Sequence, residues 1–345
     1  MRVLVTGGLG FIGSNFIRHM LAAQRRISIV NLDLCTYAGN PANLADIARD
    51  RRYRWVKGDI ADPRAVDRCM KGAEAVVHFA AETHVDRSIL DATAFLRTNV
   101  VGTQVLLDAA LRHKVSRFVH IGTDEVYGSV ARGRSREGDR LEPNSPYAAS
   151  KAAADLLVRS YVVTHGLPAV ITRASNNFGP YQHPEKALPL MITNWMDGEP
   201  FPLYGDGRNV RDWLFVLDHA RAIALVLRRG RPGEIYNIGG THCAANRELL
   251  EKVRSIMGVD PRLVRRVPDR PGHDRRYALN CGKLRALGFR HAYGFETALR
   301  QTVSWYREQQ PWWRPLKQGG GFRAYYRRQY AVRLKEEASR RSPTS

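Results

Sequence analysis

The sequence predicts an α/β protein built on a doubly wound parallel sheet, with a smaller mixed α/β lobe toward the C-terminus. Apolar, β-branched runs recur along the first half of the chain, and helical stretches lie between them. The runs are continuous rather than alternating, which is typical of strands covered on both faces. Helices between such strands imply parallel crossovers, so the first half is expected to be a Rossmann domain.

The elements of this domain can be placed in order along the chain. Strands are expected at 3–6, 27–33, 53–59, 75–80, 117–122, 168–173 and 234–240. Helical spacing of apolar residues is found at 14–24, 92–113 and 147–165. Gly166 is a suitable end for the last of these helices. Residues 1–175 are therefore predicted to form the Rossmann domain, to which the chain returns near 213–240.

The texture of the sequence changes after residue 175. Proline, glycine and aromatic residues become frequent, and we expect a smaller substrate-binding lobe over 176–317. Residues 318–345 are predicted to form a basic tail, in which a glycine hinge precedes a tyrosine-bearing segment that can be helical. Residues 338–345 are expected to be disordered because they lack apolar side chains that could pack.

The bulk composition excludes several classes of protein. The 345 residues are 44% hydrophobic and 25% charged, which is typical of a soluble globular protein. The chain shows no signal peptide and no apolar run long enough to span a membrane, so we expect a cytoplasmic protein without a membrane partner. Four scattered cysteines without metal-ligand spacing predict reduced thiols and no metal site.

The formal charge of +21 raises the question of a nucleic-acid partner. Residues 261–290 hold nine Lys and Arg against two Asp, and residues 317–345 hold eight against two Glu. Because the charge is concentrated near the C-terminus, we interpret it as an arginine-rich composition with a solvated tail, and no nucleic acid is expected. The alternative is an anionic partner, for which the pyrophosphate of a nucleotide is sufficient.

A glycine-rich turn, TGGLGFIGS at 6–14, follows the first strand and predicts a dinucleotide site. Glycines in such a turn let the backbone approach a pyrophosphate, which then lies at the N-terminus of the following helix. Two glycine sets fit the known fingerprints: Gly8, Gly10 and Gly13 fit GxGxxG, and Gly7, Gly10 and Gly13 fit GxxGxxG.

The expected cofactor of this site is NAD. Asp33 lies at the end of the second strand, twenty residues after Gly13. A carboxylate at that place accepts hydrogen bonds from the ribose hydroxyls and repels a 2′-phosphate, so NAD is favoured over NADP.

Tyr147 and Lys151 lie four residues apart in YAASK and are expected on one face of a helix. A lysine ammonium beside the phenol, together with the positive charge of the cofactor, would lower the pKa of the phenol toward neutrality. The phenolate can then take a proton from a sugar or alcohol hydroxyl while hydride leaves the same carbon. Thr123, at the end of the strand over 117–122, can hydrogen-bond that hydroxyl and share the proton.

Asp124 and Glu125 stand side by side directly after Thr123, in TDEVYG at 123–128. Two neighbouring carboxyls tend to share one proton, so one can act as a base while the other acts as an acid. The sequence does not decide which of the two is protonated. The alternative is that both acids only cap or solvate the end of a strand.

Several motifs extend over most of the chain: TGGLGFIGS, FAAETHVDRS at 79–88, TDEVYG, SPYAASK at 145–151, SNNFGPYQHPEK at 175–186, RDWLFVLDHARA and RPGHDRRYA. Together they resemble the extended short-chain dehydrogenase/reductases and, within them, the dTDP-glucose 4,6-dehydratases. The resemblance covers about residues 1–317. TDEVYG is its most specific motif, because the sugar 4-epimerases of this superfamily lack the paired acids.

The resemblance implies a lyase of deoxysugar biosynthesis that dehydrates dTDP-glucose to dTDP-4-keto-6-deoxyglucose with tightly bound NAD. In that reaction carbon 4 of the hexose is oxidised, water is eliminated across carbons 5 and 6, and hydride returns to carbon 6. The resemblance implies that Glu125 is the base and Asp124 the acid of the elimination. It also implies that Tyr147 works at the 4-hydroxyl with Lys151 and Thr123.

Binding residues are carried over in the same way, position by position. Cofactor binding is expected at Gly7, Gly10, Phe11, Ile12, Gly13, Asp33, Leu34, Cys35, Thr36, Asp59, Ile60, Phe79, Ala80, Ala81, Thr83, Thr98, Tyr147, Lys151 and Asn176. Substrate binding is expected at Thr83, Thr123, Asn177, Lys186, Tyr204, Arg211, Asn246 and His273. Among these, the guanidinium fork of Arg211 suits the oxygens of a pyrophosphate.

Three features depart from the family's pattern. Thr83 stands where a serine is usual, Gly122 replaces a small hydroxyl residue, and the segment after residue 317 lies beyond the family's ordinary end. The family also implies a homodimer that packs two helices of each subunit, for which 92–113 and 147–165 are the candidates.

Two classes of alternative function remain open. The first is another NAD-dependent nucleotide-sugar enzyme, namely a 4-epimerase, a UDP-glucuronate decarboxylase or a UDP-glucose 4,6-dehydratase. The second is a non-catalytic protein that binds NAD or nucleic acid. The paired acids count against the epimerase and the decarboxylase, and the intact Thr123, Tyr147 and Lys151 count against the second class. The sequence does not decide between thymidine and uridine, or which deoxysugar pathway uses the product.

Overall fold

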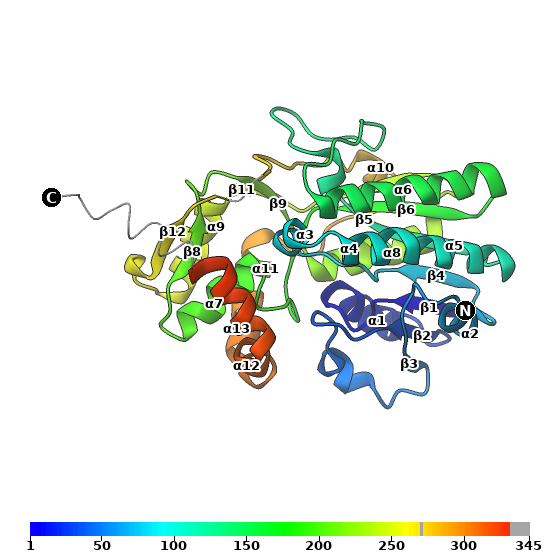
Figure 1. Ribbon diagram of the computed structural model, residues 1–345, viewed down its shortest axis with the longest axis horizontal. Coiled ribbons are helices and arrows are strands. Elements are labelled where there is room, and N and C mark those ends of the chain that lie inside the picture. The colour runs from blue at the N-terminus through cyan, green and yellow to red at the C-terminus, as the bar shows by residue number, and fades with distance from the viewer. Residues whose placement is uncertain (270–271, 332–345) are drawn as a thin grey trace.

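The computed structural model describes residues 1–269 and 272–331. Within these residues, seven parallel strands form the main sheet in the order β10–β6–β5–β4–β1–β2–β3, at the right of Figure 1. The strands are β1 (Arg2–Thr6), β2 (Ser28–Asp33), β3 (Tyr53–Lys57), β4 (Ala75–His78), β5 (Arg117–Thr123), β6 (Ala169–Ala174) and β10 (Ile235–Ile238). Strand order reverses between β1 and β4, so the predicted doubly wound parallel sheet is confirmed.

Helices cover both faces of this sheet, which explains the continuous apolar runs. Successive residues of β1 point to opposite faces: Val3 and Val5 pack in one core, and Leu4 packs in the other. The first core contains side chains from α1 (Phe11–Ala23) and α8 (Val216–Arg229). The second contains side chains from α2 (Pro63–Met70), α5 (Thr103–Arg112) and α6 (Pro146–His165).

The segment predicted as one helix over 92–113 is interrupted. It consists of α4 (Thr93–Phe95), the π-helical turn η2 (Leu96–Gly102) and α5. The wider turn lets Asn99 reach two neighbours at once, because its side-chain amide donates to the carbonyl of Glu82 at 3.0 Å and to Ser150 Oγ at 2.8 Å. It thereby ties the loop after β4 to α6.

Helix α6 follows its sequence signals closely. Ser145 caps its first turn by accepting a hydrogen bond from the amide of Ala148 at 3.1 Å. Gly166 ends it in the left-handed conformation, with φ of 66°.

The second lobe has its own sheets and its own core, at the left of Figure 1. One sheet has the order β11–β9–β7 with one parallel and one antiparallel pairing, and another pairs β12 with β8. Their bounds are β7 (Asn176–Phe178), β8 (Phe201–Tyr204), β9 (Val210–Phe215), β11 (His242–Ala245) and β12 (Val264–Val267). The accompanying helices are α7 (Ala187–Met196), α9 (Asn246–Met257) and α11 (Phe295–Glu308). Shorter elements, distributed over both parts of the molecule, are η1 (Pro41–Ile47), α3 (Val85–Leu90), η3 (Asp124–Tyr127), η4 (Pro261–Leu263) and α10 (Gly282–Ala286).

The expectation of a solvated tail is wrong for residues 318–331. After α12 (Gln310–Gln318) the chain continues through α13 (Gly320–Tyr326) and the π-helical turn η5 (Arg327–Ala331), shown in red in Figure 1. Phe322, Tyr325 and Tyr330 are buried, and Phe322 and Tyr330 belong to the core of the second lobe. Their spacing puts these side chains on one helical face that packs, while the arginines between them stay outside. The predicted disorder of 338–345 concerns positions outside the described residues.

No helix in residues 1–269 and 272–331 is long and apolar enough to cross a membrane.

Candidate active site

A cavity of about 480 Å³ lies at the carboxyl ends of the main-sheet strands, where ligands bind in doubly wound sheets. Most residues predicted for cofactor, substrate or catalysis line it: Gly7, Gly10, Phe11, Ile12, Gly13, Asp33, Leu34, Thr36, Asp59, Ile60, Phe79, Ala80, Ala81, Thr83, Thr98, Thr123, Asp124, Glu125, Tyr147, Lys151, Asn176, Asn177 and Lys186. Cys35 does not line it, and neither do Tyr204, Arg211, Asn246 and His273.

The glycines of the first turn divide into two roles. Gly7, Gly10 and Gly13 line the cavity, so the GxxGxxG spacing is the one that faces it. Gly7 has φ of 72°, and a Cβ there would lie 2.5 Å from the amide nitrogen of Ala80. Gly8 instead lies against Asn31, where its amide donates to the side-chain oxygen at 2.9 Å.

Asp33 lines the cavity and also stabilises the loops that form its wall. Its Oδ2 accepts the amide of Leu9 at 2.9 Å, and its Oδ1 accepts the amide of Cys35 at 2.7 Å. Cys35 has φ of 59°, and its thiol contacts the carbonyl of Gly39, which explains why this residue misses the cavity. Burial raises the pKa of Asp33, and the two amide hydrogen bonds oppose that rise.

The chemistry of the cavity fits NAD. The glycine cradle and Asp33 suit a pyrophosphate and a ribose diol. At the other end, Ser175 Oγ, Asn176 Oδ1 and Gln182 Oε1 are buried without a hydrogen-bond partner in the described part of the chain, and all three residues line the cavity. Buried polar atoms need partners, and a ribose or carboxamide would supply them.

Thr123, Asp124 and Glu125 enter the cavity from the end of β5. Thr123 caps the short η3 turn by accepting the amide of Glu125 at 3.3 Å. Asp124 is 3% exposed. Burial, and then the charge of Glu125, raises the pKa of Asp124 well above its ordinary value. The surroundings of Asp124 therefore favour its protonated form.

Tyr147 faces this pair of acids from α6. Burial and the charge of Glu125 raise its pKa, whereas a hydrogen bond with Thr123 lowers it. Its backbone amide donates to Ser88 Oγ at 3.2 Å. The lowered pKa predicted for this phenol is thus not produced by the protein alone.

The position of Lys151 explains part of the difference between the predicted and the observed direction of the Tyr147 pKa shift. Its ammonium donates to the carbonyl of Ile121 at 2.8 Å and makes no hydrogen bond to Tyr147 within residues 1–269 and 272–331. Burial lowers the pKa of Lys151 to about 8, and Asp155 opposes the change. The lysine therefore ties α6 to β5 and faces the cavity, instead of contacting the phenol directly.

The four predicted substrate residues outside the cavity lie on the second lobe. Tyr204 and His273 are in ring contact, with centroids 6.2 Å apart. Arg211 is buried over the ring of Tyr277, and its guanidinium donates to the carbonyl of Asp274 at 3.0 Å. Asn246 begins α9.

Comparison with known proteins shows which family this chain resembles. A family model described as GDP-mannose 4,6 dehydratase matches residues 4–302. A dTDP-glucose 4,6-dehydratase of Streptomyces niveus is 54% identical over 322 residues, which cover 92% of this chain and 96% of the relative. The corresponding enzyme of Streptomyces antibioticus is 53% identical, with the same two shares.

The chain belongs to the dTDP-glucose 4,6-dehydratase family.

Solved structures agree with the family assignment. A dTDP-glucose 4,6-dehydratase from Streptomyces venezuelae, solved with NAD and TYD bound, has a TM-score of 0.90 and 55% identity over 92% of this chain and 100% of that chain. A UDP-glucose 4-epimerase from Thermus thermophilus, in complex with NAD, has a TM-score of 0.83 and 34% identity over 90% and 100%. The fold is thus shared between the dehydratase family and an epimerase. The fold alone therefore does not distinguish the two activities, and the residues of the site have to do so.

Sequence reasoning missed several residues that line the cavity of this dTDP-glucose 4,6-dehydratase family member. Glu82, Gln182 and Glu185 lie inside the motifs FAAETHVDRS and SNNFGPYQHPEK, so the motifs marked their place. His219 orients Asn177 with a 2.8 Å contact between Nδ1 and Oδ1, and burial lowers its pKa to about 3. Arg97 pairs with Asp59 at 2.7 Å, and no motif indicated it.

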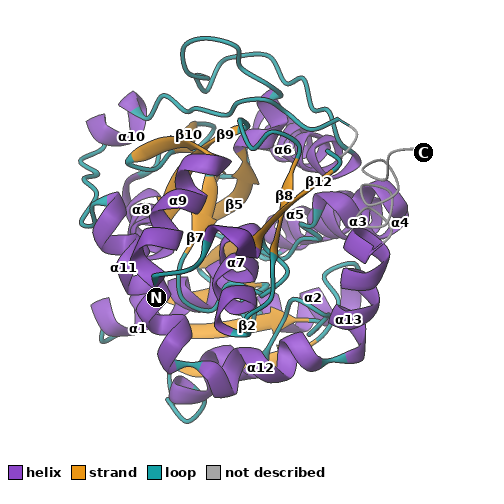
Figure 2. Ribbon diagram, turned by 90° about the vertical axis from the view of Figure 1, so that its left-hand side faces the viewer, coloured by secondary structure: helices purple, strands orange, loops and turns teal. Residues whose placement is uncertain are grey.

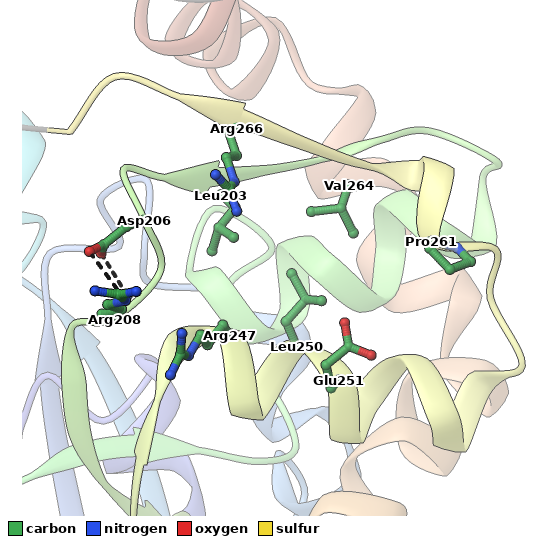
Figure 3. A pocket seen from close by; sticks show the side chains of 9 residues that line it. All are labelled: Leu203, Asp206, Arg208, Arg247, Leu250, Glu251, Pro261, Val264 and Arg266. Atoms are coloured by element: carbon green, nitrogen blue, oxygen red, sulfur yellow. Dashed lines mark hydrogen bonds and ion pairs between the residues drawn. The ribbon is translucent and has the colours of Figure 1, made fainter.

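A second cavity of about 320 Å³ lies on the second lobe, between the β8–β12 sheet and α9. Figure 3 shows that Arg208 turns toward Asp206 there. It is lined by Leu203, Asp206, Arg208, Arg247, Leu250, Glu251, Pro261, Val264 and Arg266, and none of these was predicted as a site residue. The described residues contain no group of three or more potential metal ligands.

Proposed function

We propose that this protein uses NAD to dehydrate dTDP-glucose to dTDP-4-keto-6-deoxyglucose. The family supports the reaction, and one arrangement in this chain carries it: the buried Asp124 stands beside Glu125 at the strand end that also presents Thr123 to Tyr147. An elimination needs an acid and a base together, and this pair supplies both.

Each side chain then has a role in the reaction. Tyr147 takes the proton of the 4-hydroxyl and shares it with Thr123. NAD, held by the glycine turn and Asp33, would supply the chemistry of hydride acceptance and return. Glu125 removes the proton at carbon 5, and Asp124 donates its proton to the departing 6-hydroxyl, which would otherwise leave as hydroxide. The position of Lys151 on the Ile121 carbonyl supports a role in holding the cofactor side of the cavity.

The oxidised nicotinamide of NAD would add a positive charge to the cavity that Tyr147 lines. Because burial raises the pKa of this phenol in the protein alone, the lowering that proton transfer needs has to come with the cofactor. Asn176 and Gln182, which have buried polar atoms at that end of the cavity, suit the polar groups of NAD.

The test is mass spectrometry of dTDP-glucose, and separately of UDP-glucose, after incubation with purified protein and no added NAD. We expect dTDP-glucose, and not UDP-glucose, to lose one water. No NAD needs to be added, because the cofactor is regenerated in each turnover. A matched Tyr147→Phe variant should give no product. Water loss from UDP-glucose instead would show a UDP-glucose 4,6-dehydratase, and epimerised or decarboxylated product without water loss would contradict the proposed roles of Asp124 and Glu125.

A second copy of the chain is the proposed partner besides the nucleotide sugar. Large apolar side chains are exposed on the two helical segments expected at a dimer interface: Leu96 and Val101 on η2, and Leu156 and Val163 on α6. Val163 is 72% exposed and Leu156 is 55% exposed. Neighbouring exposed apolar side chains of this kind favour burial against a matching surface.

The division of the chain into parts is also proposed. Residues 1–175 supply the first six strands of the main sheet, and α8 and β10 return to it near 213–240. Residues 176–317 supply most of the second lobe, and 318–331 pack on that lobe.

A further inference from the structure

The C-terminal helical segment, defined as α13 and η5 over residues 320–331, contacts His84, Asp86 on α3 and Tyr204 on β8. The family model ends its match at residue 302, well before this segment begins. Figure 2 shows α13 at the edge of the second lobe, next to α3 of the main-sheet domain. The segment therefore spans two parts of the molecule that come from distant regions of the sequence.

Five side chains form a network that connects the segment to the rest of the protein. The Tyr325 hydroxyl lies 3.3 Å from Asp86 Oδ2 and 3.2 Å from His84 Nε2. The same Asp86 oxygen accepts the hydroxyl of Tyr204 at 3.2 Å. Gln329 Nε2 donates to the oxygen of Tyr204 at 2.9 Å. The C-terminal segment thus holds both Tyr204 and the loop that leads into α3.

The protons of this network are consistent with one another. Tyr204 and Tyr325 each donate their hydroxyl proton to Asp86, and each keeps lone pairs to accept from Gln329 and His84, respectively. Tyr325, Asp86, His84 and Gln329 are all less than 9% exposed. Hydrogen bonds to a carboxylate away from water are stronger than neutral, exposed ones, so the network is able to fix positions.

The network leads to the cavity along two routes. His84 follows Thr83, which lines the cavity, and it precedes α3. On the next turn of α3, Ser88 accepts the backbone amide of Tyr147 at 3.2 Å. The position of α3 therefore influences the position of the first turn of α6, which carries Tyr147.

Arg87 makes the second route. Its guanidinium lies 4.8 Å from the ring centroid of Tyr325 and 4.0 Å from that of Tyr37. It also forms an ion pair with Glu185 at 3.0 Å, and Glu185 lines the cavity beside Lys186. The ring of Tyr325 thus supports the arginine that holds the cavity wall.

We propose that the C-terminal helical segment is a clamp that sets affinity for the nucleotide sugar, with Tyr325 and Gln329 as positioning residues. They act through Asp86 and Tyr204, and they touch neither substrate nor cofactor. The effect on affinity rests on the proposed function, because this effect requires Tyr204 to face the nucleotide of the substrate. The effect on the position of α3 does not depend on the proposed function.

The chain offers a matched control for the test. Tyr326 is the next residue on the same helix, and its hydroxyl lies 3.3 Å from Asn194 Nδ2, on the second lobe and away from Asp86. The variants are Tyr325→Phe, Gln329→Leu and the control Tyr326→Phe, each made in the full-length holoenzyme. All three keep nearly the same side-chain volume, so each is expected to fold.

Two measurements are made on each variant. Steady-state kinetics with dTDP-glucose should show KM raised about two- to tenfold in Tyr325→Phe and Gln329→Leu, with kcat within about twofold of the original. Tyr325→Phe loses the hydrogen bonds with Asp86 and His84, and Gln329→Leu loses the one with Tyr204. Amide hydrogen exchange followed by mass spectrometry should be faster over residues 83–90 in Tyr325→Phe. Tyr326→Phe should change neither quantity.

Each other outcome decides against one of the two proposals. Unchanged KM and unchanged exchange in Tyr325→Phe would overturn the clamp. An equal rise of KM in Tyr326→Phe would also overturn it, since packing of the helix would then explain the effect. If the original protein forms no keto sugar, the proposed function fails, and the exchange over 83–90 still decides whether Tyr325 holds α3.

Discussion

Asp155 and Arg173 form a buried ion pair beneath the candidate active site, with Arg173 Nε 2.8 Å from Asp155 Oδ2. The two side chains are 1% and 4% exposed, respectively. Asp155 lies one helical turn after Lys151 on α6, and Arg173 lies on the neighbouring strand β6. The pair therefore joins the helix of Tyr147 to the main sheet.

We expect Asp155→Asn to lower the free energy of unfolding by about 3 to 5 kcal/mol, because it leaves the Arg173 guanidinium buried without its counter-charge. Burial raises the pKa of Asp155, but His120 and Arg173 outweigh it and leave the pKa below its ordinary value. The stabilisation is therefore fully present above the ordinary pKa of an aspartate and is lost as the pH falls through the lower native value. Urea unfolding from neutral to acid pH measures it, and the difference between the proteins should shrink in acid.

The control for this prediction is the exposed pair of Asp260 and Arg262, with 2.8 Å between Oδ2 and Nη2. Asp260→Asn should leave the urea midpoint unchanged within error, because solvent screens an exposed pair. If Asp155→Asn and Asp260→Asn have the same small effect, the buried pair does not hold α6 on the sheet.

Asp124→Asn should separate the oxidation from the elimination. The amide keeps the shape of the carboxyl but cannot donate a proton to the departing hydroxyl, so kcat should fall about 10²- to 10⁴-fold. Oxidation at carbon 4, for which Tyr147 takes the hydroxyl proton, stays possible, and the absorbance of reduced nicotinamide should build up in a single turnover. Absence of that build-up, with kcat also lost, would show that Asp124 acts in the first step.

The pH profile of the unsubstituted protein tests the same assignment. Because burial and Glu125 raise the pKa of Asp124, this carboxyl is protonated below that raised pKa and loses its proton above it. The contribution of the acid to kcat should therefore be complete at low pH and decline as the pH rises through the raised pKa. The Asp124→Asn variant should lack this decline, and a profile with the same alkaline limb in both proteins would contradict the assignment.

Much of this arrangement could be predicted from the sequence because its causes are local. Continuous apolar runs identified the strands of the main sheet. Because these strands are parallel, Thr123 and the two acids lie at the same edge of the sheet as the glycine turn. The apolar spacing over 147–165 and the terminal Gly166 predicted the bounds of α6 almost to the residue. Each of these features depends on a few neighbouring residues.

Features that depend on distant contacts could not be predicted. Nothing near Lys151 in the sequence indicates that its ammonium binds the Ile121 carbonyl instead of the phenol of Tyr147. The C-terminal segment was expected to be solvated because it is basic, although Phe322 and Tyr325 have the spacing of a packed helical face. That expectation rested on the charge of the segment. The spacing of its apolar residues predicts the observed packing better than its charge does.

Asp33→Ala should weaken NAD binding without creating a preference for NADP. The change removes the acceptor of two loop amides, those of Leu9 and Cys35, so the loop loses support along with the ribose contact. We expect a loss of about 1 to 3 kcal/mol of stability from the two unpaired amides. Calorimetric titration with each cofactor and urea unfolding measure the two effects. Binding of NADP by Asp33→Ala as tight as NAD binding by the original would show that the carboxylate acts only by repelling the 2′-phosphate.

A charge placed on the exposed apolar face of α6 should separate the proposed dimer. Leu156→Glu with Val163→Glu puts two carboxylates where a second copy would have to bury them, and an unpaired buried charge is strongly unfavourable. Light scattering after gel filtration should give twice the chain mass for the original protein and the single chain mass for this variant. Trp55→Gln, on the exposed edge strand β3, is the control and should stay dimeric, because it lies at the opposite edge of the sheet from β6 and β10. An original protein that is monomeric at every concentration would mean that these side chains are exposed for another reason.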